Sequence, residues 1–407
     1  MATGESITHL PFFVRLGEME ESSPAWRRTR GGLLVLRLID TVYRDPAKTD
    51  SWNLRAIRTA VGEIAPTDHL QSLLNGILDA VAGAERGVPP GLLSRVMAFG
   101  RALDFTAEWD LASDVYRTVL RHARPDHEGE IAVDACMRLG YCGRMEGRWD
   151  AAMDAYMHAG RLADALGDRP RRLRVHHQQA TVVRLRGNLP LAQQMVEETI
   201  ALCDRREDAN VLAPILHERA IIALLRKEFA TSLFYANRSL ELEHESAQRD
   251  RVLTDMASAF LELGIRSAAR DAYMLVVATG QEQYTRWVAT INLMELASLD
   301  GAETVFHSYR SELESAPLPP PLRAGFLLMA GRGLHYFGSA EQGNTLLREA
   351  RGLSELNALN DMYFQSEASL ANPPKPHVEP AVEPVMISEN LQQIARSLRH
   401  QREKAGV

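Results

Sequence analysis

The 407-residue sequence predicts an all-α fold built from stacked helix pairs, and three observations support this. Long amphipathic stretches alternate with short turns, and the strict alternation of a half-buried β-strand is absent from the sequence. Short motifs also recur every 37 to 40 residues, which is typical of helical repeats. In such proteins each helix pair buries its apolar face against its neighbours.

The N-terminal part reads as three helices before any clear repeat. The first begins at Pro24 and runs to residue 44, where the following Asp45-Pro46 stops it. Two more are predicted at about 51–65 and 68–84. The segment GVPPG at 87–91 cannot continue a helix and marks the first internal boundary.

The repeat itself is defined by a large residue every 40 positions and by two small residues at fixed offsets from it. The large residues are Trp109, Trp149, Leu189 and Phe229. The small residues, twelve positions apart, are Gly100 and Ala112, Gly140 and Ala152, Ala180 and Ala192, and Ala220 and Ser232. After Ser232 the step shortens to 37, giving Ala257 and Ala269, a degenerate copy near Phe306, and Gly331 and Gly343.

Four residues after the second small position most copies have an aromatic or apolar residue. These residues are Tyr116, Tyr156, Val196, Tyr273 and Leu347. Four residues correspond to about one helical turn, so the small and the bulky residue share a helix face. They form a hole and a knob that let adjacent helices pack closely.

This pattern resembles the tetratricopeptide repeat, most clearly at residues 131–160. There Leu139-Gly140, Ala152, Tyr156 and Ala159 match the family's Leu-Gly, Ala, aromatic and small positions. The resemblance covers about residues 93–352 in seven copies, but the period exceeds the family's ~34 residues, and the early Trp and most late Pro are missing. It implies a right-handed superhelical α-solenoid of helix-turn-helix repeats. The alternative is a non-repeating helical bundle with coincidental spacings.

Four segments follow from this reading. Residues 1–90 form an N-terminal helical cap, with an eroded repeat at 51–84, and residues 91–370 form the solenoid of about seven repeats. Residues 371–386 contain ANPPKPHVEPAVEP and are predicted to be a proline-rich linker. Residues 387–407 form an amphipathic helix whose apolar face is Leu391, Ile394 and Leu398.

The resemblance also implies that the first helix of each pair lines a concave, partner-binding groove. Carried over at the family's offsets, the groove residues are Met97, Arg101, Asp134, Met137, Arg138, Tyr141, Arg144, Arg174, His177, Thr181, Arg184 and His217. Arginines dominate the middle of this set, and guanidinium groups bind carboxylates and phosphates bidentately. We therefore expect a protein or peptide partner with an acidic segment. The alternative is that these arginines are ordinary solvated surface residues.

Composition and motifs argue against other classes of function. The net charge of -7 argues against a chain that coats nucleic acid or anionic membrane, although the basic stretch at 169–186 could contact phosphates. Three cysteines, no signal peptide and no transmembrane stretch favour the cytoplasm. No nucleotide, hydrolase or zinc motif is present, so we expect no catalytic residues, no cofactor and no metal.

The sequence thus predicts a non-enzymatic scaffold or adaptor that holds a peptide or helix of a partner protein in its arginine-lined groove. The alternative is a signalling or transcription-regulatory sensor whose solenoid binds a small peptide or nucleic acid. Residues 1–65 show no helix-turn-helix domain, so such a sensor would need a partner that contacts DNA. Oligomeric state and the identity of the partner are not encoded in any of these patterns.

Overall fold

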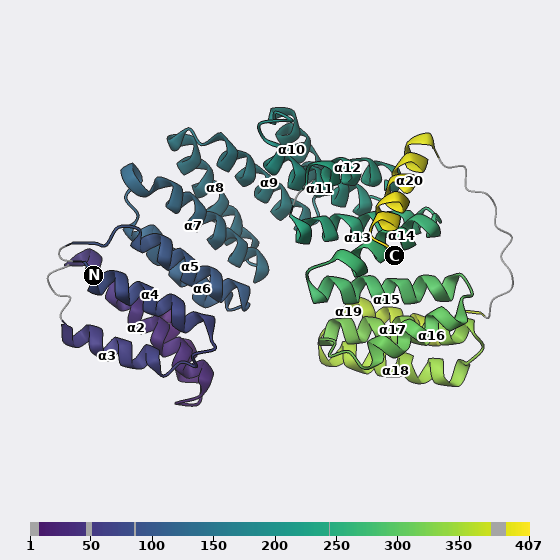
Figure 1. Cartoon of the computed structure of the whole chain (residues 1–407), viewed down its shortest axis with the longest axis horizontal. Helices are drawn as coiled ribbons and strands as arrows, with labels where there is room; N and C mark the ends of the chain where they lie inside the picture. Colours follow the sequence, from purple (N-terminus) through teal and green to yellow (C-terminus); the bar gives the residue numbers. More distant parts are fainter. Residues whose placement is uncertain (1–7, 46–50, 85–86, 244, 376–387) are drawn as a thin grey trace. The chain divides into compact units, whose positions relative to one another are not determined.

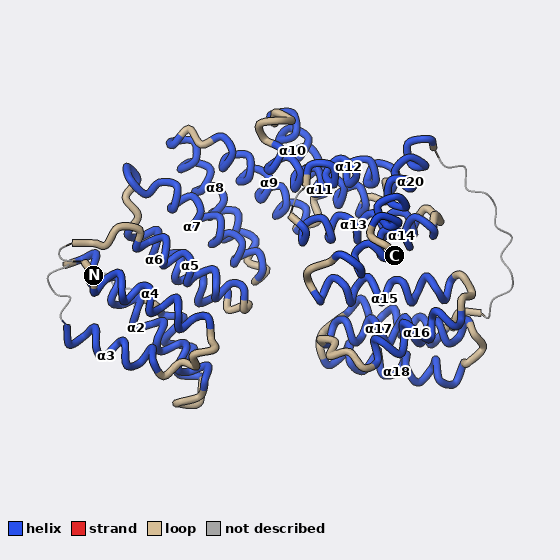
Figure 2. Tube along the Cα trace, viewed as in Figure 1, coloured by secondary structure: helices blue, strands red, loops and turns tan. Residues whose placement is uncertain are grey.

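The computed structural model describes residues 8–45, 51–84, 87–243, 245–375 and 388–407. These residues form 20 α-helices and no strand, which confirms the all-α prediction (Figure 2). The chain divides into two compact units, with the boundary after Met195 inside one helix, and each unit is described separately below. The predicted linker at 371–386 lies mostly outside the described residues.

Unit 1 begins with four helices and continues with helices of the repeat (Figure 1). Its helices are α1 (Leu10–Glu18), α2 (Pro24–Arg44), α3 (Ser51–Gly62), α4 (His69–Ala82), α5 (Leu92–Phe105), α6 (Trp109–His122), α7 (Pro125–Met145), α8 (Trp149–Leu166), α9 (Arg169–Leu185) and the first part of α10 (Leu189–Leu202). The proline start and stop predicted for 24–44 match α2.

Unit 2 contains the remaining repeat helices and the C-terminal helix. After the end of α10 these are α11 (Ala209–Leu225), α12 (Phe229–Leu242), α13 (Ser246–Glu262), α14 (Arg266–Thr279), α15 (Gln283–Leu299), α16 (Glu303–Glu314), α17 (Pro320–Tyr336), α18 (Ala340–Leu356), α19 (Asn360–Ala371) and α20 (Glu389–Lys404).

Helices α5 to α18 alternate as the first and second helix of a pair, and the turn within each pair has one conformation. Three residues separate the two helices, as between Phe105 and Trp109, and the middle one has a positive φ of 62° to 86°. These middle residues are Ala107, Gly147, Gly187, Lys227, Gly264, Gly301 and Gly338. They recur first every 40 and then every 37 residues, which confirms the predicted period. Most are glycine because a Cβ is strained at positive φ.

In the structure the predicted knob packs against the first small residue of the repeat, on the facing helix, and not against the second small residue, which the spacing predicts as its hole. A Cβ on Gly100 would lie 2.5 Å from the ring of Tyr116, and one on Gly140 would lie 2.5 Å from the ring of Tyr156. Both tyrosines are fully buried. The same contact recurs in unit 2, where a Cβ on Gly331 would lie 2.8 Å from Leu347. Glycine on the first helix is therefore the hole that the knob on the second helix fills.

The N-terminal helices share a core with the first repeat helices. One apolar cluster runs from Phe12 in α1 to Cys142 in α7 and includes α2, α4, α5 and α6. A second cluster joins α7, α8 and α9. In unit 2, one cluster joins helices from α11 to α15 with α20, and another joins α15 to α18.

A buried charge network attaches α1 to this core. His9 precedes α1 and is 2% exposed; its Nδ1 lies 2.7 Å from Asp114 Oδ2 in α6, and its Nε2 lies 3.1 Å from Asp40 Oδ2 in α2. His122 Nε2 and an Arg121 amine lie 2.6 and 2.9 Å from the second oxygen of Asp40. Burial lowers the pKa of His9, but the hydrogen bonds to the two carboxylates outweigh it and raise the pKa to about 9.

The turn geometry yields a first prediction. Replacing Lys227 by glycine removes a side chain from a strained left-handed position and should raise the free energy of unfolding of unit 2 by about 1 kcal/mol. The matched change Gly187→Ala should lower the stability of unit 1 by about the same amount, because a Cβ there meets open space and adds only backbone strain. Chemical denaturation measures both. Equal effects of the same sign would contradict this explanation.

The His9 network yields a second prediction, which concerns pH. The folded-state pKa of about 9 exceeds the unfolded value near 6.5, so the network's stabilisation is fully present below pH ~6.5 and is lost as pH rises through 9. His9→Ala should therefore lower the melting temperature of the chain much more at pH 6 than at pH 9.5. The cost at pH 6 should be about 3 kcal/mol, as when one partner of a buried ion pair is removed.

The control for this experiment is His69→Ala, since His69 is exposed at the start of α4. It should leave the melting temperature unchanged at both pH values. A His9→Ala effect that does not vary with pH would show that His9 stabilises α1 by packing alone.

Candidate functional site

A cavity in unit 1 gathers six of the twelve predicted groove residues, from three successive first helices. It has a volume of about 320 Å³ and lies on α5, α7 and α9. Its lining residues are Met97, Arg101, Asp134, Met137, Arg138, Arg171 and Arg174. All of these except Arg171 belong to the predicted groove set. We call these seven residues the arginine pocket.

One guanidinium of the arginine pocket is held in place by carboxylates. Arg171 Nε donates to Asp134 Oδ1 at 3.0 Å, and an Arg171 terminal amine donates to Asp168 Oδ2 at 2.5 Å. Asp168 also caps α9, accepting a bond from the backbone N–H of Arg171 at 3.0 Å. Arg171 is thus oriented by a helix cap and by the neighbouring first helix.

A second arginine is linked to the packing of the helix pair. Arg138 lies 3.5 Å from Asp104 Oδ2, and the same oxygen accepts a hydrogen bond from the hydroxyl of Tyr116 at 2.6 Å. Burial, followed by this bond, raises the pKa of Tyr116 far above its usual range, so the hydroxyl remains a donor. The knob of the first repeat therefore also positions a pocket residue.

The remaining two arginines of the pocket are exposed to solvent. Arg101 and Arg174 make no ion pair with any described residue, and both side chains are exposed. The lining contains four arginines and one aspartate, and the neighbouring Asp104, Glu130 and Asp168 pair with Arg138 and Arg171. Two cations with no carboxylate partner beside two cations that are held in place make a site suited to anionic groups.

Next to the pocket on α7, an aromatic ring lies between two arginines. The guanidinium carbons of Arg138 and Arg144 lie 6.0 and 5.4 Å from the centre of the Tyr141 ring. The Nε of Arg144 is buried and has no hydrogen-bond partner among the described residues. These residues extend the cationic surface toward the C-terminal end of α7.

Other predicted groove residues contribute to the fold and lie outside the pocket lining. Thr181 in α9 is buried and donates to the backbone oxygen of His177 at 3.1 Å. Arg184 lies in the last turn of the same helix. His217 belongs to unit 2, where its ring nitrogens lie 2.7 Å from Asp255 Oδ2 and 2.9 Å from Gln248 Nε2. Both nitrogens of His217 are thus already used within the fold.

The pocket also contains a residue that the groove prediction missed. Arg171 belongs to the basic stretch at 169–186, and the structure places the arginines of that stretch on several faces. Arg172 pairs with Asp164, and Arg186 pairs with Asp150, both in α8. Arg171 precedes Arg174 by three residues and so shares its helix face, and this spacing was the signal that could have identified it.

The predicted apolar face of the C-terminal helix is buried within unit 2. Leu391, Ile394 and Leu398 join the core cluster of α12 to α14 and are 8%, 8% and 1% exposed. In the described structure α20 packs on α12 and α14, which are second helices. Helix α20 therefore does not cover the face that the first helices of unit 2 form.

The described residues offer little for other chemistry. Cys136 and Cys142 are buried, and burial raises the pKa of each thiol to about 12, so neither is a thiolate at neutral pH. Among the described residues no three His, Cys, Asp or Glu side chains are placed to hold a metal ion. No helix in the described part of the chain is long and apolar enough to span a membrane.

The chain is similar to several solved structures. The apo form of the quorum sensor NprR from B. thuringiensis aligns over 84% of this chain and 91% of its own, with 14% identity and a TM-score of 0.52. A Rap protein complexed with competence and sporulation factor aligns over 82% and 99%, with 13% identity and a TM-score of 0.49. A tetratricopeptide repeat protein from Parabacteroides merdae aligns over 68% and 98%, with 10% identity and a TM-score of 0.45.

No protein-family model matches the chain, and no curated protein matches it in sequence. At 14% identity the NprR similarity shows the fold alone. Together with the regular turns and the knob-and-hole contacts, it identifies the chain as a tetratricopeptide-like helical-repeat protein.

Proposed function

We propose that this chain is a non-enzymatic, cytoplasmic scaffold or adaptor that binds an acidic peptide segment of a partner protein in the arginine pocket. The observation that carries the proposal is the convergence of four guanidinium groups and one carboxylate in a cavity on three successive first helices. Guanidinium groups bind carboxylates through pairs of charge-assisted hydrogen bonds.

The roles of the pocket residues differ. Arg171 and Arg138 are already oriented by Asp134, Asp168 and Asp104, so they can receive a carboxylate without much loss of side-chain entropy. Arg101 and Arg174 are exposed and can close over the ligand. An acidic peptide would replace water around four cations at once.

The apolar part of the pocket suits a peptide as well. Met97 is buried beneath the cavity and Met137 is half-buried at its wall. Methionine side chains adapt to partner groups of different shape. The site therefore favours a segment in which acidic residues flank an apolar one.

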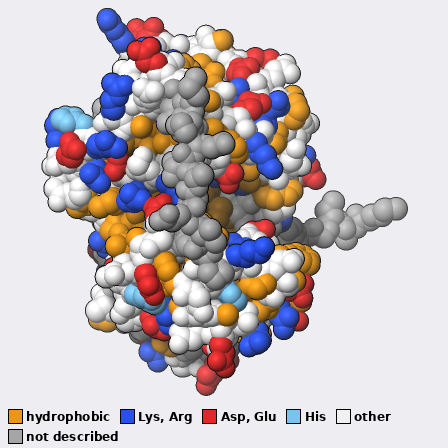
Figure 3. Space-filling model, turned by 90° about the vertical axis from the view of Figure 1, so that its right-hand side faces the viewer, with side chains coloured by type: hydrophobic (Ala, Val, Ile, Leu, Met, Phe, Trp, Pro, Cys, Tyr) orange, Lys and Arg blue, Asp and Glu red, His pale blue; other side chains and the backbone are white. Residues whose placement is uncertain are grey.

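A signalling sensor is the second candidate, and the fold shared with NprR, itself a quorum sensor, is the observation that favours it. In that case the ligand would be a small peptide or a nucleic acid, and ligand binding would alter the repeat packing. Among the described side chains visible in Figure 3, basic and acidic ones are interspersed with hydrophobic ones and form no broad basic surface for phosphates.

Charge reversal tests the scaffold proposal. The double variant Arg101→Glu, Arg174→Glu should lose its partner in cross-linking mass spectrometry from the native host, and the partner's affinity should fall at least about tenfold. The matched control is Arg117→Glu, an exposed arginine on the second helix α6. If the partners are retained by the double variant, or lost equally with the control, the arginine pocket is not the binding site.

Salt dependence separates the nucleic-acid version of the sensor from the scaffold. A protein that contacts several phosphates loses affinity for DNA steeply as salt rises, by about 10³-fold or more between 50 and 200 mM for six contacts. We expect only weak retention on duplex DNA at 50 mM salt and a shallow slope. Tight binding with a steep slope would favour the nucleic-acid sensor.

A further inference from the structure

The C-terminal helix α20 lies on a surface of unit 2 that is formed by α12 and α14, and grooves remain open beside the helix. We call this surface the seat of α20. Helix α20 packs on the second helices α12 and α14, beside which it is drawn in yellow in Figure 1. Its contact with the core depends on Leu391, Ile394 and Leu398, which follow the i, i+3, i+7 spacing of one helix face. Residues 376–387, which connect α20 to the rest of the chain, lie outside the described residues.

The seat contains a buried carboxylate that requires a cation. Asp271 in α14 has a side chain that is 6% exposed, and Arg402 and Arg399 of α20 lie 3.0 and 3.6 Å from its oxygens. A charged group removed from water is costly unless it is paired. Any helix that occupies this seat must therefore bring a positive charge within about one turn after its last apolar residue.

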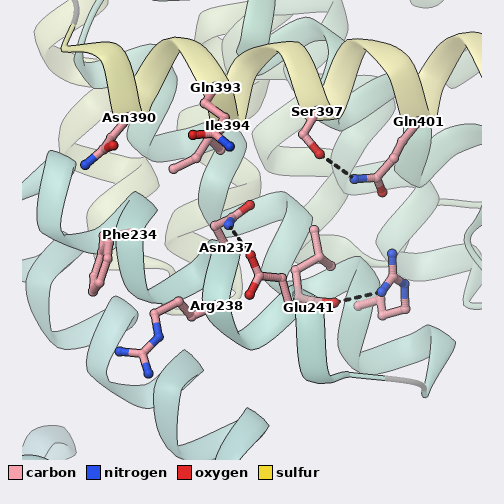
Figure 4. A pocket seen from close by; sticks show the side chains of 11 residues that line it. Phe234, Asn237, Arg238, Glu241, Asn390, Gln393, Ile394, Ser397 and Gln401 are labelled. Carbon is pink, nitrogen blue, oxygen red and sulfur yellow. Dashed lines mark hydrogen bonds between the residues drawn. The ribbon is translucent and has the colours of Figure 1, made fainter.

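The contact between α20 and α12 leaves a large cavity. It has a volume of about 450 Å³, and Figure 4 shows the side chains of α20 across it from those of α12. On the α20 side most of the lining is polar: Asn390, Gln393, Ser397 and Gln401. The cavity is a groove open to solvent, because Asn390, Gln393 and Ser397 are exposed, and it runs beside the buried contact that Leu391, Ile394 and Leu398 make.

A second cavity, of about 350 Å³, lies at the C-terminal end of α20. It is lined by Gln401, Lys404 and Ala405 of the C-terminal segment and by residues of α13 and α14 such as Leu253 and Leu275. Helix α20 is thus held by its three buried apolar residues and by the ion pairs with Asp271, and a groove lies on either side of these contacts. The seat has room for larger apolar side chains than α20 provides.

We infer that the surface formed by α12 and α14 is a docking site for an amphipathic, basic helix of a partner protein, and that α20 is the chain's own weaker occupant. The partner helix has apolar residues at the positions of Leu391, Ile394 and Leu398. It has larger apolar residues at the positions of Gln393 and Ser397. It has basic residues at the positions of Arg399 and Arg402, which pair with Asp271. This site is independent of the arginine pocket, because it lies on second helices of unit 2 and takes a basic ligand.

Competition between α20 and a partner helix follows from the tether. Covalent attachment to the same chain gives α20 a high effective concentration at this surface, so an external helix must bind more tightly to displace it. Filling the 450 Å³ cavity is the route that the structure offers for that gain.

The experiment uses the full chain and two fluorescein-labelled synthetic peptides. The first has the sequence of residues 388–407, and the second carries the changes Gln393→Leu and Ser397→Leu. Their affinities are measured by fluorescence anisotropy for the wild type and for a released variant, Leu391→Asp with Leu398→Asp. Circular dichroism checks that the released variant retains the helix content of the wild type.

We expect the native-sequence peptide to bind the released variant at least about tenfold more tightly than the wild type, because tethered α20 no longer competes. The cavity-filling peptide should bind the released variant at least about tenfold more tightly than the native sequence does. Adding Asp271→Asn to the released variant, or Arg399→Glu and Arg402→Glu to the peptides, should weaken binding several-fold.

Equal affinity for the wild type and the released variant would overturn the inference, and so would the absence of binding to a folded released variant. If the aspartates unfold the chain, the variant Arg399→Glu, Arg402→Glu in the full chain replaces it. This variant keeps the apolar residues of α20 and should still bind the cavity-filling peptide more tightly than the wild type. Charge reversal of Arg101 and Arg174 should leave peptide binding unchanged, so failure here is distinguishable from failure of the arginine-pocket proposal.

Discussion

The close approach of the two helices in a pair, made possible by a glycine opposite a knob, is the contact on which the other features depend. At Gly100 and Gly140 even a methyl group would overlap the tyrosine of the second helix. Because Tyr116 is held in that position, its hydroxyl reaches Asp104, and Asp104 in turn lies beside Arg138. Packing of the core and placement of a charged surface group are therefore consequences of one contact.

A net acidic chain can present a cationic pocket because its charges are distributed unevenly over the faces of its helices. Arginines that point toward second helices, such as Arg172 and Arg186, are matched by carboxylates of α8. On the first helices Arg101 and Arg174 form no ion pair with a described residue, so their positive charges remain where a ligand can reach them. The buried Asp271 shows the reverse arrangement in unit 2, where a carboxylate demands basic residues from whatever helix covers it.

The repeat period, the helix pairs and the knobs were predictable because each is a local pattern that the sequence states several times. Six residues of the arginine pocket were predicted through the resemblance to the tetratricopeptide repeat, whose offsets identify one face of the first helices. The His9 network and the docking of α20 were not predictable. They join residues separated by 105 positions, as His9 and Asp114, or by 128, as Arg402 and Met274. No period or spacing encodes such contacts.

The regular turn within each pair has a consequence for how this chain can vary in length. All seven turns have three residues with one left-handed position, whereas the step between repeats changes from 40 to 37 residues. The three-residue difference must therefore be taken up away from these turns. The stretch between α10 and α11, for example, spans residues 203–208, but only residues 243–245 separate α12 from α13. Differences in length are accommodated in the segments between successive pairs, whereas the turn within each pair keeps a length of three residues.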